Sequence, residues 1–194
     1  GIHGPNVMSA VTTPFMTKMM ATNLELYQAG EGVTASGVFY TAGSKYSIIA
    51  NPFASGWFSS TGSGITMGLI VAIMLFSKRD DFKAIAKLAI PCGLFNINEP
   101  IIFGIPMVMN AMFAVPFFLA PVACVCCGYL VQSLGLCPLF VIDVPWTTPV
   151  GLFGFLASSG NIMGGIWQIV IIVGVSTLIY TPFVIAANRQ EAEA

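Results

Sequence analysis

Two long runs of apolar residues stand out in the second half of the chain. They cover residues 111–136 and residues 163–187, and each exceeds the roughly 20 residues that a helix needs to cross a membrane. Pro116 and Pro121 lie inside the first run and predict kinks there. The second run is followed by the polar residues 188–194. This pattern predicts two membrane-spanning helices and a short polar tail.

Two other apolar stretches are repeatedly interrupted by proline, glycine and polar residues. They cover residues 88–110 and residues 137–162. Irregular backbone at membrane depth is tolerated only where protein covers it or where it lines a polar cavity. We therefore expect each stretch to form a re-entrant hairpin of half-helices, and we place the first break at residues 96–100. Each hairpin should enter and leave the membrane on one side.

The preceding part of the chain is more polar. Residues 1–60 predict half-helices, surface-lying helices and loops rather than spanning helices, because Gly, Pro, Thr and Asn interrupt their apolar pieces. A glycine-rich turn then leads into residues 65–76, which are too few to span and predict a re-entrant turn feeding a helix. Residues 77–87 hold four of the seven basic residues. That charge predicts a cytoplasmic location and a short helix lying on the membrane surface.

The composition indicates that the bilayer is the solvent of this chain. Hydrophobic residues make up 56% of it and charged residues only 8%, whereas charged residues make up about 25% of an average soluble domain. The net charge of −1 argues against a nucleic-acid partner, which would require clustered Lys and Arg. We predict an all-α integral membrane fold in which transmembrane helices are combined with re-entrant helical hairpins.

Glu99 and Asp143 are the only charged residues between Lys87 and Arg189. A carboxylate inside the bilayer costs about 2.5–3.5 kcal/mol on insertion scales, so it is tolerated where it faces a cavity or a polar ligand. Glu99 follows Asn98 in the first predicted break, and broken helices commonly form the binding sites of transporters. The alternative is that Glu99 only caps a half-helix. We favour a substrate site that uses Asn98 and Glu99 together.

The roles of three further residues stay open. Trp146 lies among prolines and threonines, and it suits either stacking on a sugar ring or anchoring at the headgroup level. Asp143 fits the water boundary better than a pocket. His3, the only histidine, is as consistent with packing or a surface position as with a functional role. The five cysteines lack the spacing of a zinc site and suit helix packing, so we expect no metal and no cofactor.

Five phrases occur in an order that is typical of one family. They are Gly-Ile-His-Gly at residues 1–4, Gly-Ser-Gly at 62–64, Phe-Asn-Ile-Asn-Glu-Pro-Ile-Ile-Phe-Gly at 95–104, Val-Pro-Trp-Thr-Thr-Pro at 144–149 and Tyr-Thr-Pro-Phe at 180–183. Together they resemble the membrane-embedded IIC permease component of bacterial sugar phosphotransferase systems, in the lactose, cellobiose and diacetylchitobiose branch. The resemblance covers nearly the whole chain.

The resemblance implies a function and a set of binding residues. It implies a permease component that is not itself an enzyme. Such a component binds and translocates a β-linked disaccharide and presents it to a phosphorylated IIB partner, with IIA upstream. By the same resemblance, His3, Asn98, Glu99 and Trp146 match residues that bind the sugar, and Glu99 would hold the hydroxyl that receives the phosphoryl group. The implied location is the bacterial plasma membrane, with several passes and a cytoplasmic C-terminus.

The resemblance also implies a domain organisation. Residues 1–187 would be the C-terminal, substrate-binding half of a IIC domain, and residues 188–194 a cytoplasmic tail. The chain opens in the middle of a motif, so we expect an N-terminal scaffold half, which would carry a homodimer interface, to be missing. Residues 18–55 look longer and more polar than the resemblance leads one to expect. The identity of the sugar is not visible in the sequence.

Two alternative functions stay open at this point. Glu99 and Asp143 would form a proton relay if the chain were a proton-coupled secondary transporter. A chain without its N-terminal half would also fit a non-transporting membrane fragment that only contacts other subunits.

Overall fold

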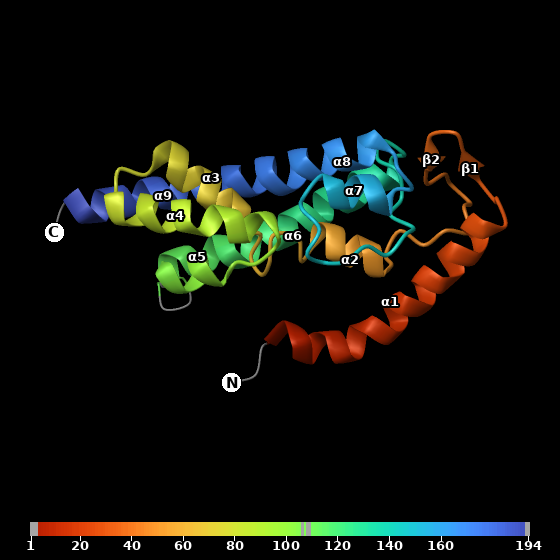
Figure 1. Ribbon diagram of the computed structural model, residues 1–194, viewed down its shortest axis with the longest axis horizontal. Helices are drawn as coiled ribbons and strands as arrows, with labels where there is room; N and C mark the ends of the chain where they lie inside the picture. The colour runs from red at the N-terminus through yellow and green to blue at the C-terminus, as the bar shows by residue number, and fades with distance from the viewer. Residues whose placement is uncertain (1–3, 106, 108–109, 193–194) are drawn as a thin grey trace.

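Two long helices run side by side along the length of the molecule (Figure 1). The structure, a computed structural model, describes residues 4–105, 107 and 110–192. One long helix is α6 (Ala111–Ser133), and the other is a continuous rod made of α8 (Ile162–Ile169), η1 (Val170–Val175) and α9 (Ser176–Ala192). Within the described residues, Ala111–Ser133 and Ile162–Arg189 are the two helices long and apolar enough to cross a membrane. Both long apolar runs are therefore helical, as predicted.

A π-helical stretch, η1, interrupts the second long helix, and the apolar pattern did not indicate it. Close packing accompanies this change. α3 (Met67–Phe76) lies against α9, and a Cβ added at Gly68 would come within 2.6 Å of the carbonyl carbon of Ser176. π-helical turns occur mostly as single-turn insertions in α-helices. Here the insertion lies directly before the residue on which α3 packs.

The first helix departs from the prediction. α1 (Gly4–Gln28) is one continuous helix of 25 residues, so the prediction of half-helices is wrong for this segment, whereas the expectation of no spanning helix holds, because α1 is not one of the two candidate spans among the described residues. Pro14 lies inside the helix without ending it. Residues 15–28 contain no further proline or glycine, and nine of these fourteen residues (three Met, two Leu and one each of Ala, Glu, Lys and Gln) are good helix formers. Helix propensity therefore outweighed the scattered Thr and Asn.

Short elements connect α1 to the rest of the chain. An antiparallel hairpin pairs β1 (Val33–Thr34) with β2 (Gly37–Val38), and α2 (Asn51–Trp57) follows. Residues 58–66 then form a series of turns before α3 begins, in agreement with the predicted turn that leads into a helix.

The charge-dense segment begins a helix, as predicted, but the apolar face of this helix packs into the protein core, and its place on the membrane surface stays a prediction. α4 (Asp80–Leu94) buries Phe82, Ala86 and Ala89 on one side. Beside its first turn, Arg79 forms an ion pair with Asp81 at 2.5 Å and lies 3.9 Å from the ring centroid of Phe82. α4 continues through Pro91 to Leu94 and therefore extends into the stretch for which half-helices were predicted.

Both interrupted stretches are broken where the sequence indicated. α4 ends at Leu94 and α5 (Glu99–Gly104) begins after four intervening residues, which confirms the first break. In the second stretch, turns and loops precede α7 (Leu152–Ala157), and α7 folds back against α8. Gly154 and Gly164 make this contact close, because a Cβ on Gly154 would lie 2.9 Å from the carbonyl carbon of Gly164.

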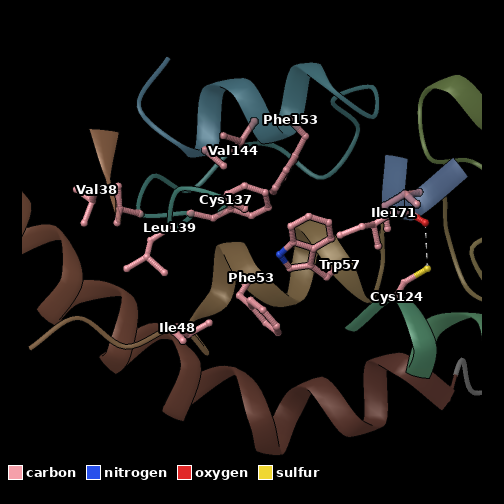
Figure 2. Close-up of a cluster of buried hydrophobic side chains, with 14 of the residues drawn as sticks. Val38, Ile48, Phe53, Trp57, Cys124, Cys137, Leu139, Val144, Phe153 and Ile171 are labelled. Carbon is pink, nitrogen blue, oxygen red and sulfur yellow. Dashed lines mark hydrogen bonds between the residues drawn. The ribbon is translucent and has the colours of Figure 1, made fainter. Parts of the chain in front are cut away.

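The buried side chains form two clusters. Figure 2 shows the first, in which Phe53 and Trp57 of α2 meet the loop before α7 and the side chain of Phe153. Within it the Trp57 and Phe140 rings stack, with centroids 5.2 Å apart. The second cluster holds side chains of α3, α4, α5, α6 and α9 together. The junction of α2 with α3 leads from the first cluster to the second, whereas the junction of α4 with α5 lies within the part of the chain that forms the second cluster.

The end of α9 is tied to the connection between α3 and α4. Asn188 donates a hydrogen bond to the carbonyl of Phe76 at 2.9 Å, and its Oδ1 accepts one from the backbone N–H of Lys78 at 2.9 Å. Residues 188–192 continue the helix rather than forming the separate tail expected from the sequence. The charge-dense segment and the last turns of α9 therefore lie at the same end of the molecule (Figure 1).

Candidate functional site

The break between α4 and α5 is formed by a defined helix-ending motif. Asn96 has a left-handed conformation, with φ of +64°. Its N–H donates to the carbonyl of Gly93 at 3.1 Å, and the N–H of Ile97 donates to the carbonyl of Cys92 at 3.0 Å. This is the Schellman arrangement, in which Asn is the residue other than Gly most often found in the left-handed position. The motif ends α4 and turns the chain so that α5 can start at Glu99.

The side chain of Asn96 joins three separate chain segments. Its Oδ1 accepts a hydrogen bond from the backbone N–H of Thr61 at 2.8 Å. Its Nδ2 donates to the carbonyl of Trp146 and to that of Thr148, the latter at 3.0 Å. Only 7% of Asn96 is exposed. The turn before α3, the break before α5 and the loop before α7 therefore meet at one buried amide.

The side chain of Asn98 also forms a hydrogen bond with the turn before α3. It is buried, and its Nδ2 donates to the carbonyl of Ser63 at 2.7 Å. Gly62 makes this approach possible, because a Cβ on Gly62 would lie 2.6 Å from Asn98 Nδ2. In the described part of the chain, no hydrogen bond is made by Asn98 Oδ1. Asn98 therefore has a structural bond through its nitrogen and an unused acceptor in its oxygen.

Glu99 is the first residue of α5 and is exposed. Its carboxylate forms neither an ion pair nor a hydrogen bond with the other described residues. The side chain thus differs from that of Asn98, which is buried beside it. Because no described residue bonds to it, this carboxylate does not stabilise the fold through a hydrogen bond or an ion pair. It is available to a polar ligand.

Trp146 lies on the loop that Asn96 holds. The residue is 62% exposed, and its neighbour Thr148 closes a turn by donating to the carbonyl of Pro145 at 2.9 Å. Trp146 lines an open groove of about 420 Å³ together with α2 and the residues that precede it in the loop. Because Asn96 bonds to the Trp146 backbone, the structure brings the predicted residues Asn98, Glu99 and Trp146 to neighbouring segments.

Two residues outside the predicted set form hydrogen bonds with the turn at 58–66, namely Gln168, which donates to Ser60 Oγ at 3.5 Å, and Tyr180. Gln168 is fully buried, accepts from the N–H groups of Gly151 and Gly154 at 2.8 Å each, and donates to the carbonyl of Gly56 at 3.1 Å. Tyr180 donates to the carbonyl of Gly64 at 2.7 Å. Sequence reasoning missed both residues. Their signal was present, since polar side chains within an apolar helix usually have a specific task.

The turn itself has an unusual backbone. Thr61 and Ile65 have positive φ values of 62° and 50°, which are rare for β-branched residues. Such conformations persist only where the surroundings determine them strongly, and they concentrate at functional sites. The hydrogen bond that Asn96 accepts from Thr61 and those that Asn98 and Tyr180 donate to Ser63 and Gly64 provide those surroundings.

Two residues singled out in the sequence, His3 and Asp143, are not among the described residues of this hydrogen-bonded cluster. His3 lies outside the described residues. Asp143 is exposed and accepts a hydrogen bond from Asn51 Nδ2 at 3.3 Å, and it lines the same groove as Trp146. In the described residues, no hydrogen bond links Glu99 to Asp143, so the geometry offers no direct relay between the two carboxylates.

Comparisons with known proteins point to a single group. Residues 1–121 match the family model described as "Phosphotransferase system, EIIC". The chain is 36% identical over 202 residues to the cellobiose-specific EIIC component of a phosphotransferase system from Lactococcus lactis, which covers 98% of this chain and 40% of that protein. It is 35% identical over 192 residues to the lichenan permease IIC component of Bacillus subtilis, with the same two coverages of 98% and 40%.

A solved structure has the same fold. The crystal structure of the transporter ChbC, the IIC component from the N,N'-diacetylchitobiose-specific phosphotransferase system, matches with a TM-score of 0.85 and 33% sequence identity. The match covers 99% of this chain and 42% of that one. The chain therefore spans about 40% of the length of the curated relatives it matches.

Proposed function

The chain belongs to the phosphotransferase system EIIC family, and from that membership we propose that it forms the substrate-binding part of a permease that binds a β-linked disaccharide and carries it across the membrane. A IIB partner, which has itself been phosphorylated by IIA, then phosphorylates the sugar. The permease positions the sugar and makes no covalent bond of its own. The observation that carries the proposal is the buried junction at Asn96, which brings the exposed Glu99 carboxylate and the exposed Trp146 to neighbouring segments.

The chemistry of these groups suits a sugar. A pyranose ring has apolar C–H faces that stack on an aromatic side chain and hydroxyls that need hydrogen-bond partners. Trp146 supplies an exposed aromatic surface, Glu99 supplies a free carboxylate, and Asn98 Oδ1 supplies a further acceptor. The names of the relatives support β-linked substrates, since one is cellobiose-specific and another is a permease for lichenan. His3 belongs to the proposed binding set by family resemblance.

In this proposal Glu99 binds the hydroxyl that receives the phosphoryl group. A carboxylate that accepts a hydrogen bond from a hydroxyl forms a charge-assisted bond, which is roughly twice as strong as a neutral one. A site built to hydrogen-bond a hydroxyl also rejects ligands that lack it, because its polar groups are then left unpaired. Glu99 would therefore contribute to both affinity and selectivity.

The arrangement in the membrane is part of the proposal. We place α6 and the Ile162–Arg189 helix across the bilayer, and the α4–α5 and α7–α8 breaks in re-entrant hairpins. Asn188 ties the end of α9 to the segment that contains the basic residues 78, 79, 83 and 87. By the positive-inside rule, that end and the C-terminus are cytoplasmic. Residues 1–187 act as the substrate-binding half, and a scaffold half would mediate homodimer formation.

The deciding experiment measures equilibrium binding of cellobiose, diacetylchitobiose and lactose to the purified protein and to the Glu99→Gln variant. We expect selective binding in the wild type and at least about a tenfold loss in Glu99→Gln, because a charge-assisted hydrogen bond contributes about 1.5–3 kcal/mol. Glu25→Gln, an exposed carboxylate on α1, serves as the matched control and should bind as the wild type does.

Transport assays separate the alternatives. Uptake into vesicles that depends on IIB and not on a proton gradient supports the proposal. Uptake that depends on the proton gradient and proceeds without IIB would replace it with a proton-coupled transporter. A folded protein that binds none of the three sugars would refute it.

A further inference from the structure

We propose that one buried water molecule binds between the indole N–H of Trp57 and the side-chain carbonyl oxygen of Gln132, and that it joins α2 to α6. Both residues have an exposed fraction of 0%. Among the residues that the structure describes, Trp57 Nε1 and Gln132 Oε1 are buried side-chain atoms without a hydrogen-bond partner. Neither residue belongs to the proposed sugar site, so this inference does not depend on the proposed function.

The two unpaired atoms are chemically complementary. The indole N–H of Trp57 can only donate a hydrogen bond, and the amide oxygen of Gln132 can only accept one. A polar atom that is buried without a partner costs free energy, and ordered water molecules commonly bind such atoms inside proteins. Water accepts and donates at the same time, so one molecule satisfies both atoms. A cation would be repelled by the N–H, and an anion would be repelled by the oxygen.

The Trp57 ring packs against the face of α6 that carries Gln132. A Cβ added at Gly128 would come within 2.9 Å of Trp57 Cε2, the ring carbon that is bonded to Nε1. Gln132 follows Gly128 by four residues in α6, and residues four apart are neighbours on one face of a helix. The indole N–H and the amide oxygen are therefore neighbours that do not bond to each other directly.

The segment that follows α6 contacts both side chains. Gln132 Nε2 donates to the carbonyl of Pro138 at 2.9 Å, which orients the amide and leaves its oxygen unpaired. Two residues further along, the ring of Phe140 stacks on that of Trp57, with centroids 5.2 Å apart. α2, α6 and this segment therefore meet around the two unpaired atoms.

Figure 2 shows the direction of the indole N–H. The nitrogen of Trp57 lies on the side of the ring that faces away from Cys124 and toward Cys137. Cys124 lies in the middle of α6, whereas Cys137 follows the end of this helix. The N–H is therefore directed toward the C-terminal end of α6, and Gln132 lies in the last turn there.

A water at this position would hold the start of the turn at 58–66. Trp57 is the last residue of α2, and the turn follows it directly. Waters that bridge buried polar groups are part of the structure and are costly to remove. This one gives the indole a polar connection to α6 in addition to its stacking on Phe140, and so it fixes the orientation of the ring.

Nuclear magnetic resonance of the indole groups tests the site in the purified chain in detergent micelles. The chain contains three Trp residues. Variants Trp146→Phe and Trp167→Phe assign two of the indole signals, so the third belongs to Trp57. In the wild type we expect cross peaks between the Trp57 indole proton and water that have opposite signs in laboratory-frame and rotating-frame Overhauser spectra. Opposite signs indicate a water held at the site, whereas proton exchange with solvent gives the same sign in both spectra.

Trp167 is the matched control, because its Nε1 already donates to the carbonyl of Leu136 at 3.0 Å. Its indole proton should show no cross peak to a held water. A Gln132→Met variant keeps a side chain of similar length and removes the amide oxygen. In this variant the Trp57 cross peak should be lost, because the water no longer has its acceptor.

The wild-type measurement decides the proposal even where Gln132→Met fails to fold. A folded wild type without the Trp57 cross peak would overturn the proposal, and so would equal cross peaks for Trp57 and Trp167. A cross peak of unchanged size in folded Gln132→Met would also overturn it, because the water would then bind without the oxygen of Gln132.

Discussion

Asn96 should be the residue on which the geometry of the site depends most. Replacement by Gly keeps the left-handed conformation accessible and removes three hydrogen bonds, to Thr61, Trp146 and Thr148. At roughly 1 kcal/mol net for each bond, we expect Asn96→Gly to lower the free energy of unfolding by about 3 kcal/mol. For a domain of this size, that corresponds to a midpoint of thermal unfolding roughly 6–12 °C lower.

The comparison with Asn96→Ala separates the side chain from the backbone. Alanine loses the same three hydrogen bonds and in addition must adopt φ near the observed +64°, which costs about 1–2 kcal/mol for a residue with a Cβ. The midpoint of thermal unfolding should therefore be lower for Asn96→Ala than for Asn96→Gly. Equal midpoints for the two variants would mean that the left-handed conformation contributes nothing measurable.

Sugar binding tests whether Asn96 positions Trp146. The control is Asn23→Ala, because Asn23 is a buried amide that bridges Ser47 with hydrogen bonds of 2.7 and 2.8 Å at the far end of α1. Both variants are assayed by thermal unfolding in detergent and by equilibrium binding of cellobiose. We expect both to lose stability and only Asn96→Gly to lose affinity. An Asn96→Gly protein with wild-type stability and wild-type affinity would refute the reasoning.

Two other predictions follow from close packing and from charge. Gly62→Ala should lower the free energy of unfolding by about 2–3 kcal/mol, because the new methyl group meets Asn98 and φ is +80°. Gly30→Ala, with φ of +74° and open space around it, should pay only the backbone cost of about 1 kcal/mol, and thermal unfolding that failed to rank the two variants would contradict the packing argument. The hydrogen bond from Arg79 holds the pKa of Asp81 below its usual value. The pair should therefore stabilise the fold at pH values above the usual Asp pKa of about 3.9. This contribution should be lost as the pH falls through the lowered pKa of Asp81. Because the side chain of Asp81 is 52% exposed, the contribution should stay below about 1 kcal/mol. Unfolding midpoints of the wild type and Asp81→Asn should therefore differ slightly at neutral pH and converge in acid, whereas a constant difference would contradict the assignment.

Much of the helix pattern could be read from the residues themselves. The two long apolar runs became α6 and the Ile162–Arg189 helix, and α5 starts at Glu99, inside the predicted break. These features depend on local chemistry, namely the absence of charge and the placement of proline, glycine and asparagine. Local propensity also explains the failure at α1, where good helix formers after Pro14 sustain a helix that the mixed composition did not suggest.

The candidate site was predicted in its residue types but not in its connections. Glu99 was selected because an isolated carboxylate in an apolar stretch needs a reason, and the structure leaves its side chain exposed. Asn98 was predicted to bind substrate together with Glu99, but the sequence did not indicate that its nitrogen bonds to Ser63. Asn96 had no predicted role in binding, although its side chain makes more hydrogen bonds to other chain segments than the side chain of Asn98 or Glu99 does.

The sequence by itself determined where helices can run and where they must break, because both depend on residues near each other in the chain. Only the tertiary structure decided which breaks meet. Thr61 and Trp146 lie 35 and 50 residues from Asn96, and no local pattern specifies such a pairing. Buried backbone groups must find hydrogen-bond partners, and in the turns of this fold those partners come from side chains of distant segments. The proposed site at Glu99 and Trp146 depends on Asn96, whose side chain supplies such partners to two other breaks, the turn before α3 and the loop before α7.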